Sequence, residues 1–306
     1  MSDEMVVTFL GTSSAPPIVG RRQSSIAIKY RGNTLVVDVG EGAQIEMLRN
    51  KIGFKKMTIL LTHLHADHTL GLMGLLTTRN FLNIKTPITI IGPTWTSQFL
   101  SILFLAYRFK PEYEVSVFET KGDTVIDNKD LIVESFPVTH SIESVGYSII
   151  TRPKKGVFNP QKALELRIPK GKLWKNLQEG NSIEFEGKEY FPEQVIDEIE
   201  LKNLKIVITG DTEYDERIVE KAYDADLLIH DATYPPEEVE RAKKHSHSTC
   251  IDAAKIAQLS KAKKLVLTHI SQLHSDLDYS LSESKKIFPN SILAYDGLQI
   301  KLKVKN

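Results

Sequence analysis

The sequence predicts an α/β protein whose mixed sheets are covered by helices, and two observations support this fold class. Short runs of Val, Ile and Leu, typical of strands buried on both faces, recur in both halves of the 306-residue chain. Stretches with the apolar spacing of helices separate these runs. Hydrophobic residues make up 41% of the chain, which is enough to bury one large core or two modest ones.

The strand-like runs share a polar ending, because each stops at Asp or His, usually beside Gly or Thr. A buried strand holds a charged side chain poorly, whereas the loop after its carboxyl end can hold one. We therefore expect one edge of a sheet to gather His and Asp from distant parts of the chain. The runs cover residues 35–38, 59–63, 136–140, 206–211, 227–231, 265–269 and 292–296.

Helices are expected between the runs, and one segment fits neither pattern. The helical stretches are 41–50, 70–81, 94–109, 215–223, 235–244, 248–260 and 281–288. Residues 152–190 lack a strong strand or helix period, and 152–175 contain eight basic residues and a single acidic one, Glu165. We interpret 152–190 as an arm inserted into a domain that spans 1–306. An ordinary solvated loop is the alternative.

Charge and cysteine content restrict the partners and the compartment. Lys plus Arg and Asp plus Glu both number 39, so any nucleic-acid-binding surface must be a local basic patch. The only cysteine, Cys250, permits no intrachain disulfide and fits a reducing cytosol. The start of the chain does not resemble a secretory signal, and no apolar run approaches the roughly 20 residues that a membrane helix needs. These features predict a cytoplasmic protein with no membrane partner.

The segment Thr62-His63-Leu64-His65-Ala66-Asp67-His68 carries the clearest chemical signal. Three imidazoles and a carboxylate occupy six consecutive positions just after a buried strand, and these groups suit zinc and similar ions. Alternate residues of an extended segment point the same way, so His63 and His65 can hold one ion. A turn at Asp67-His68 can present a second set of ligands. Two ions need further ligands, which the other strand ends supply.

Those further ligands are His140, Asp211 and His269, and each taken singly could instead be a core or capping residue. Together with the T-H-x-H-x-D-H segment, they resemble the ordered ligand motifs of the metallo-β-lactamase superfamily. The resemblance implies an αββα four-layer sandwich with an inserted flexible arm and a two-metal site at one edge. It implies one zinc held by His63, His65 and His140, and a second held by Asp67, His68 and His269, with Asp211 bridging. Asp38, followed by Gly40, matches the superfamily's buried Asp that supports the metal loop.

Further segments resemble the ribonuclease Z branch of this superfamily over nearly the whole chain. They are Phe9–Thr12, Asp38–Gly42, Gly71–Leu76, His230–Thr233 and His247–Thr249, with Asp231 where the branch has Glu. The resemblance implies a zinc-dependent endoribonuclease that removes the 3′ trailer of precursor tRNA. Metal-activated hydroxide would attack the phosphodiester and leave a 3′-hydroxyl on the tRNA.

Three residues have expected catalytic roles. Asp67 could bind a metal and also orient the attacking water. Asp231 could hold one tautomer of His247 and raise its pKa, so that His247 protonates the leaving oxygen or stabilises the phosphorane. A helix cap near Ser246 or Ser248 is the alternative for His247. Because Asp is one methylene shorter than Glu, the reach of Asp231 to His247 stays open.

Two segments bear on substrate and assembly. Residues 152–190 fall where ribonuclease Z carries its tRNA-binding arm, and Ile168–Trp174 resembles the arm tip, with Lys172 in place of Pro. This implies precursor tRNA as the partner and a homodimer in which one subunit's arm serves the other's active site. In Pro17–Arg22 the branch's Lys and Asn are absent, which leaves the cleavage position open. Arg21 and Arg22 either contact phosphates or form a solvated turn.

Other functions on the same fold are the alternatives. Hydrolases of small phosphodiesters or thioesters would share the ligands but would need no basic arm and no His247 segment. A redox di-iron protein usually carries Glu where this chain has His65. Non-enzymatic RNA-binding relatives tend to lose ligands, whereas this set is complete.

Overall fold

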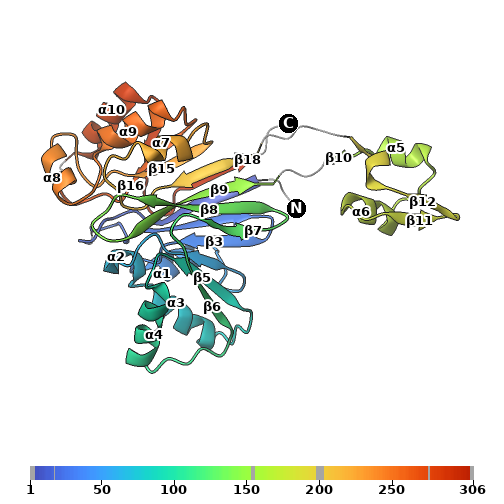
Figure 1. Cartoon of the computed structure of the whole chain (residues 1–306), viewed down its shortest axis with the longest axis horizontal. Coiled ribbons are helices and arrows are strands. Elements are labelled where there is room, and N and C mark those ends of the chain that lie inside the picture. Colours follow the sequence, from blue (N-terminus) through green and yellow to red (C-terminus); the bar gives the residue numbers. More distant parts are fainter. Residues whose placement is uncertain (1–3, 17, 153–155, 198–202, 275, 304–306) are drawn as a thin grey trace. The chain divides into compact units, whose positions relative to one another are not determined.

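Two seven-stranded sheets pack face to face in the part of the chain that the computed structural model describes, residues 4–16, 18–152, 156–197, 203–274 and 276–303 (Figure 1). Pro17 and residues 153–155 of the expected arm lie outside the described residues. The first sheet has the order β18 (Gln299–Lys303), β1 (Glu4–Gly11), β2 (Ser25–Tyr30), β3 (Asn33–Val37), β4 (Thr58–Leu60), β5 (Ile88–Gly92) and β6 (Val115–Glu119). The second has the order β17 (Ser291–Leu293), β16 (Leu265–Thr268), β15 (Leu227–Asp231), β14 (Lys205–Ile208), β9 (Ser144–Thr151), β8 (Leu131–Val138) and β7 (Thr124–Asp127).

Both sheets are mixed. Strands β3 to β6 are parallel to one another, as are β14 to β17. The pairs β1–β18, β1–β2, β2–β3, β9–β14 and β7–β8 are antiparallel. Parallel neighbours present their carboxyl ends at the same edge. The Tyr147 hydroxyl of β9 donates a 2.8 Å hydrogen bond to the Leu61 carbonyl and so ties the second sheet to the end of β4.

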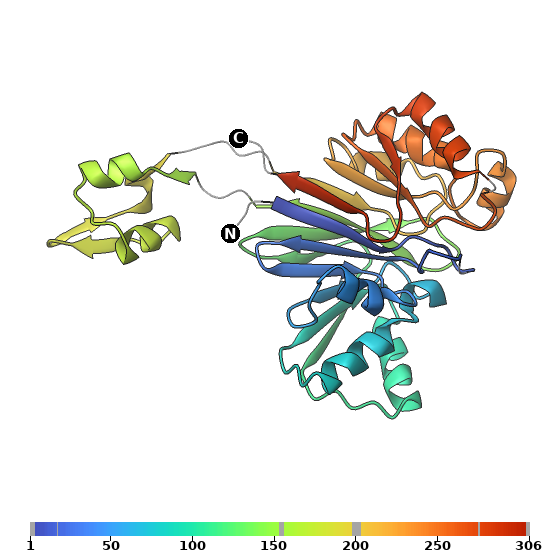
Figure 2. The same ribbon diagram turned by 180° about the vertical axis from the view of Figure 1, so that it is seen from behind.

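Helices cover the outer faces of both sheets, which gives the four layers αββα (Figures 1 and 2). The first sheet carries α1 (Ala43–Arg49), α2 (Ala66–Thr69), α3 (Leu72–Phe81) and α4 (Thr96–Ala106), and the second carries α7 (Arg217–Lys221), α8 (Val239–Lys244), α9 (Cys250–Leu259) and α10 (Leu277–Ile287). Met47 and Leu76 pack with Ile59 in the first core, and Ile256 packs with Leu228 in the second. Each such side chain contributes about 1.5–3 kcal/mol when fully buried.

Most of the predicted elements are present. Each of the seven runs contains or overlaps a strand, and each of the seven helical stretches contains or overlaps a helix. The turn expected at Asp67-His68 is instead the one-turn helix α2. None of the described helices is both long and apolar enough to cross a membrane.

A second compact unit lies within residues 151–203 and has its own small core. It contains β10 (Val157–Phe158), α5 (Pro160–Glu165), α6 (Lys172–Gln178), β11 (Ile183–Phe185), β12 (Lys188–Tyr190), the 3-10 helix η1 (Pro192–Gln194) and β13 (Ile196–Asp197). Ala163, Ile168, Leu177, Ile183 and Val195 form that core. The segment predicted as an arm therefore has regular structure although its sequence shows no strong period, because helices of six and seven residues are too short to show a clear apolar period.

Candidate metal centre

The expected ligands come together at one edge of the sandwich, because each follows the end of a strand. Strands β14, β15 and β16 are parallel neighbours, so their carboxyl ends lie side by side. The backbone N–H of Val145 in β9 donates a 2.8 Å bond to the Thr62 carbonyl, which joins the second sheet to the loop after β4. Both sheets therefore supply the site, where the sequence pattern suggested one.

His63, His65 and His140 form a first ligand group, with their ligand atoms within 4.8 Å of one another. His65 Nδ1 lies 3.0 Å from His63 Nε2 and 3.2 Å from His140 Nε2. The outer ring nitrogens are held by the protein, with His63 Nδ1 3.0 Å from Thr62 Oγ1 and His140 Nδ1 2.8 Å from the Ser246 carbonyl. Such outer contacts fix the tautomers and leave the inner nitrogens available to a cation.

Asp67, His68, Asp211 and His269 form a second group, and all four are buried. His269 Nε2 lies 3.2 Å from Asp67 Oδ2 and 3.3 Å from His68 Nε2. Two carboxylates buried this close together need protons or a cation to offset their charge.

Asp211 lies between the two groups. Its Oδ2 is 3.7 Å from His63 Nε2 and 3.3 Å from the Nε2 atoms of both His68 and His269. Its Oδ1 is buried and has no hydrogen-bond partner among the described residues. A buried carboxylate oxygen without a partner is costly, and a cation would satisfy it. The converging nitrogens and this oxygen suit divalent metal ions.

Burial favours the metal-binding form of the first group. It lowers the pKa of His63 well below the usual 6.5, and repulsion from His68 acts in the same direction. It also lowers the pKa values of His65 and His140, despite the attraction of Asp211. These imidazoles are therefore neutral at pH 7, which is the form that binds metals.

Asp38 supports the metal loop from behind. Its Oδ1 accepts a 2.7 Å bond from the Thr62 backbone, its Oδ2 accepts a 2.8 Å bond from the Thr62 hydroxyl, and its Oδ2 also lies 2.7 Å from His68 Nδ1. The carboxylate thus orients His68 through its outer nitrogen. A Cβ at Gly71 would lie 2.2 Å from the Gly40 carbonyl oxygen, so a glycine lets the loop after His68 approach the Asp38 loop.

Asp231 and His247 form a pair beside the second group. Asp231 Oδ2 lies 2.7 Å from His247 Nδ1, so the shorter carboxylate reaches the imidazole. Burial opposes a positive charge on His247, but the attraction of Asp231 outweighs it and raises the pKa to about 9. The cap of α9 is Thr249, whose side chain accepts a bond from the Asp252 backbone, so His247 and its neighbours Ser246 and Ser248 do not cap this helix.

Three contact residues of the site were not singled out from the sequence. Thr62 and Ser246 hold outer nitrogens of the first group, and Thr233 Oγ1 lies 2.7 Å from the outer nitrogen of His269. Hydroxyl and carbonyl groups are common in loops, so residue type alone does not mark them. The usable signal was position, because Thr62 and Thr233 are each the second residue after the end of a strand.

Arg21 braces the loop that precedes β2. Its Nη1 donates 2.7 Å bonds to the Thr12 hydroxyl and to the Ala294 carbonyl. Its backbone N–H closes a turn onto the Ile18 carbonyl at 2.9 Å. Arg21 therefore belongs to a turn, as one of the two interpretations expected, but its guanidinium is bonded within the protein rather than solvated.

Arg22 lines an open groove, which Arg21 also lines. The Arg22 side chain is 44% exposed, and its Nε lies 3.8 Å from Glu46 Oε1. The groove has a volume of about 340 Å³ and is also lined by Gln44, Leu70 and Gly71. Since Leu70 and Gly71 follow the ligand His68 in the chain, the groove adjoins the metal loop.

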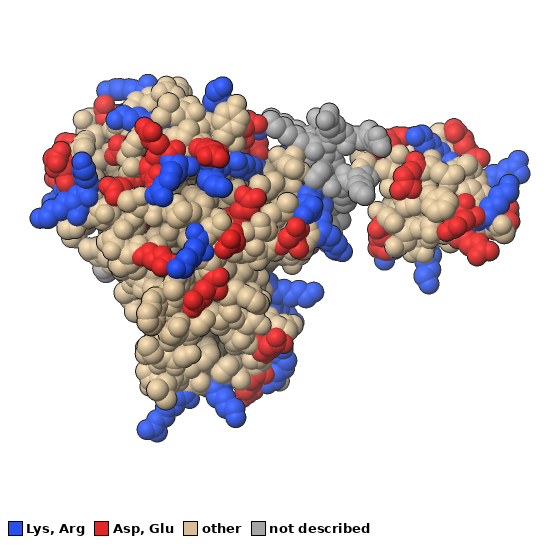
Figure 3. Space-filling model, in the orientation of Figure 1, with Lys and Arg blue, Asp and Glu red and all other residues tan. Residues whose placement is uncertain are grey.

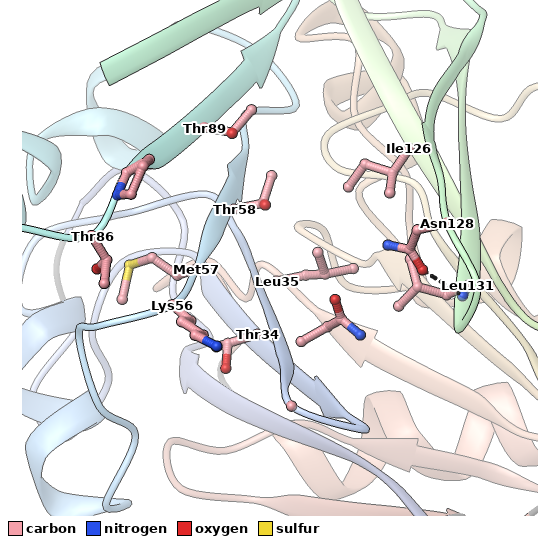
Figure 4. A pocket seen from close by; sticks show the side chains of 13 residues that line it. Thr34, Leu35, Lys56, Met57, Thr58, Thr86, Thr89, Ile126, Asn128 and Leu131 are labelled. Atoms are coloured by element: carbon pink, nitrogen blue, oxygen red, sulfur yellow. Dashed lines mark hydrogen bonds between the residues drawn. The ribbon is translucent and has the colours of Figure 1, made fainter. Parts of the chain in front are cut away.

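A separate cavity of about 330 Å³ lies near the amino ends of β3, β4 and β5 (Figure 4). Thr34, Thr58 and Thr89 line one side, and Ile126 and Asn128 of the β7–β8 hairpin line the other. No imidazole or carboxylate is among its described lining residues. The metal-binding chemistry therefore lies at the opposite edge of the sandwich.

Comparison with known proteins gives a consistent result. A family model described as the anti-Pycsar protein Apyc1 matches residues 5–150, and one described as a beta-lactamase superfamily domain matches residues 198–270. Ribonuclease Z of Methanosarcina acetivorans is 38% identical over 97% of both chains, and that of Archaeoglobus fulgidus is 37% identical over the same shares.

Solved structures agree with the sequence relatives. The human short-form tRNase Z superposes with a TM-score of 0.69 at 26% identity, over 96% of this chain and 98% of that chain. The metallo-β-lactamase fold protein YhfI of Bacillus subtilis superposes with a TM-score of 0.71 at 17% identity, over 98% of this chain and 100% of that chain, which shows the fold alone. The expected metallo-β-lactamase sandwich is confirmed.

Proposed function

Because this chain belongs to the ribonuclease Z family, it is an endoribonuclease of tRNA 3′ processing, and we propose that it works with two zinc ions at the strand-end centre. The convergence of two ligand groups on Asp211 carries this proposal. The reaction hydrolyses one phosphodiester of a 3′-extended tRNA precursor, which releases the trailer and leaves a 3′-hydroxyl on the tRNA.

In this proposal His63, His65 and His140 hold one ion, and Asp67, His68 and His269 hold the other, with Asp211 shared. When bound, such ions supply an acidified water as nucleophile and neutralise the charge that builds on the phosphoryl oxygens. Asp67 is buried, and its Oδ2 lies 3.2 Å from His269 Nε2 within the second ligand group. An ionised Asp67 accepts the proton of the attacking water and keeps that water oriented.

His247 acts on the other side of the scissile bond. Its pKa of about 9 keeps it protonated at neutral pH, and its Nδ1 bond to Asp231 leaves Nε2 to donate. A proton delivered to the 3′ oxygen of the tRNA would stabilise that leaving group as the bond breaks. The ring of His247 stacks 5.2 Å from that of His269, so the donor lies beside the second ligand group.

The Arg22 groove is the proposed path for the RNA strand next to the scissile phosphodiester. It adjoins the metal loop, and the Arg22 side chain is 44% exposed. One arginine in such a groove neutralises one phosphate. Arg21 has a different part, since its Nη1 bonds position the turn that carries Arg22.

The unit within 151–203 is proposed to be the tRNA-binding arm. Arg167, Lys170, Lys172 and Lys175 are near one another in the chain around the start of α6, and Trp174 Nε1 donates a 2.8 Å bond to the Ile168 carbonyl that anchors this loop. The β11–β12 hairpin is mainly acidic, so the positive charge of the unit is local. Lysine and arginine side chains at such a loop bind phosphates without reading sequence.

We also propose a homodimer that uses the exposed apolar face of α3 and α4. Phe81, Leu82, Ile102, Leu105 and Tyr107 are 56–86% exposed. The two helices end beside each other, because the Asn80 side chain bonds the backbone of Lys110 and of Glu112. Figure 3 shows few charges over these helices. A contiguous apolar surface of this kind is typical of a protein interface.

The test is cleavage of a 3′-extended precursor tRNA by the zinc-loaded protein, with the product ends mapped, beside an aryl phosphodiester. We expect a single cut at the tRNA–trailer junction and a 3′-hydroxyl on the tRNA. Hydrolysis of the aryl diester without any cut in the precursor would instead support a small-molecule hydrolase.

A cytoplasmic location is part of the proposal, supported by Cys250, which is buried and unpaired.

A further inference from the structure

We propose that Thr233 is a positioning residue that orients the metal ligand His269 and the Asp231–His247 pair through a single hydroxyl group. This inference rests on the proposed function, because it concerns how two parts of that active site are aligned with each other. Thr233 lies in the loop after β15 and is 4% exposed.

The Thr233 hydroxyl contacts three groups of the site. Its Oγ1 lies 2.6 Å from Asp231 Oδ1, 2.7 Å from His269 Nδ1 and 3.1 Å from His247 Nδ1. Thr62, the other hydroxyl that contacts a site imidazole among the described residues, bonds His63 and Asp38 instead. Thr233 is thus placed where the second ligand group meets the proton donor.

The direction of each bond follows from the donors available. A hydroxyl has one proton and two lone pairs, and an ionised carboxylate only accepts. The Thr233 proton therefore goes to Asp231 Oδ1, and the Thr233 oxygen accepts the Nδ1 proton of His269. Since a neutral imidazole carries one N–H, His269 Nε2 is left unprotonated. That atom lies 3.2 Å from Asp67 Oδ2 and 3.3 Å from Asp211 Oδ2.

The same hydroxyl sets the orientation of Asp231. With Oδ1 bonded to Thr233, the Oδ2 atom faces His247 Nδ1 at 2.7 Å. The Thr233 backbone N–H also donates to Oδ1 at 2.8 Å. A Thr233→Val substitution therefore leaves this carboxylate oxygen with one partner, but it leaves the Nδ1 proton of His269 with none. The substitution should consequently weaken zinc binding through His269 more than it lowers the stability of the fold.

The experiment compares T233V with T233S in the full-length protein. Zinc affinity is measured by competition with a chromophoric chelator, and thermal melts of the metal-free proteins control for folding. We expect T233V to bind zinc about 10–100-fold more weakly than wild type, as is usual when an outer contact of a ligand is removed, and T233S to restore the affinity. Equal zinc affinity in T233V and wild type would overturn the proposal.

A double-mutant cycle tests the link to His247. Cleavage of precursor tRNA at saturating zinc is compared among wild type, T233V, H247A and T233V/H247A. We expect T233V to slow cleavage less in the H247A background, because part of its effect acts through His247. Strictly additive effects would overturn that part of the proposal. If wild type binds zinc but cuts no precursor, the proposed function fails, while the affinity comparison still tests Thr233.

Discussion

Asp231 Oδ2 lies 2.7 Å from His247 Nδ1, and this contact gives the imidazole both its orientation and its raised pKa of about 9. Asp231 therefore reaches His247 although its side chain is one methylene shorter than the Glu of the ribonuclease Z branch. The loop after β15 compensates for the shorter side chain, because Thr233 and the Thr212 backbone hold both carboxylate oxygens in place.

His247→Ala should slow cleavage of precursor tRNA by about 10²–10⁴-fold, which is the usual contribution of a positioned proton donor. The 3′ oxygen of a ribose is a poor leaving group and needs that proton. Nitrophenolate is a good leaving group that needs no proton, so the rate of hydrolysis of a nitrophenyl phosphodiester should change much less. Steady-state rates with both substrates measure the difference.

His245→Ala is the matched control for that substitution, since His245 is exposed and its ring only stacks on Tyr234 at 6.3 Å. H245A should cleave both substrates like wild type. If H247A lost both activities equally, His247 would serve the metal site rather than the leaving group.

His65→Ala and Asp67→Ala should each abolish cleavage while the far-ultraviolet circular dichroism stays unchanged. His65 is the one member of the first group whose Nδ1 contacts both of the others, and Asp67 contributes to the second group. Both lie in the loop and short helix after β4, away from the main cores. Bound zinc, measured by elemental analysis after dialysis, should fall in each variant. Full activity in either one would contradict the two-metal mechanism.

Part of the site could be predicted from the sequence alone. The pattern of strand runs ending in His or Asp predicted that such side chains gather at an edge, because parallel strands share the direction of their carboxyl ends. The relation between the two sheets did not follow from the runs, since β9 and β14 pair across an insertion of more than fifty residues. The resemblance to a known family supplied that part.

Contacts made by common residue types stayed invisible to the sequence. Thr233 lies in the segment His230–Thr233, which resembles the ribonuclease Z branch. Its residue type nevertheless does not distinguish a hydroxyl that joins His269 to Asp231 from one that faces solvent. The sequence predicted an insertion at 152–190, but the helices and strands of the small unit were missed for a related reason. Asn159 caps α5 by accepting bonds from two backbone N–H groups, and Pro160 follows it, but these signals are short and stand between glycines and prolines.

Arg22→Ala should weaken precursor tRNA binding and reduce the slope of log affinity against log salt by about 1, because one phosphate contact is lost. Binding at several salt concentrations, measured by filter retention with the zinc-free protein, gives the slope. Arg49→Ala is the control: Arg49 is exposed and bonds the same Glu46, but it does not line the groove. An equal change in both variants would argue that the groove is not the path of the RNA.

The basic residues around the start of α6 should contribute to the binding of precursor tRNA but not to the hydrolysis of small substrates. Lys170, Lys172 and Lys175 changed together to Ala should raise KM for precursor tRNA and leave aryl diester hydrolysis unchanged. Substitution is a sharper test than deleting 156–184, because such a deletion would leave Val195 and Tyr190 without the core they pack in. Changing Lys261, Lys285 and Lys301 to Ala removes the same charge elsewhere and should have little effect. Equal losses in both triple variants would mean that net charge alone drives binding.

The apolar face of α3 and α4 gives a prediction about assembly. Wild type should have twice the chain mass of 34.5 kDa by light scattering, and I102E/L105E should have the mass of one chain. Gln98→Glu adds a charge on the same helix at an exposed polar position and should leave the dimer intact. A wild-type monomer would remove the homodimer from the proposal, and a dimeric I102E/L105E would place the interface elsewhere.

Mixing two variants that are each defective in cleaving precursor tRNA then tests whether the arm of one subunit serves the other. The first carries the Lys170, Lys172 and Lys175 substitutions and has an intact metal site, and the second carries His65→Ala and has an intact arm. In a mixed dimer the intact metal site lies on one subunit and the intact arm on the other, so the two can work together only if the arm acts between subunits. Unfolding and refolding the two together should therefore restore low-KM cleavage of precursor tRNA to a fraction of the dimers. If the arm acts within its own subunit, every site in the mixture lacks either its ligand or its arm, and KM stays high.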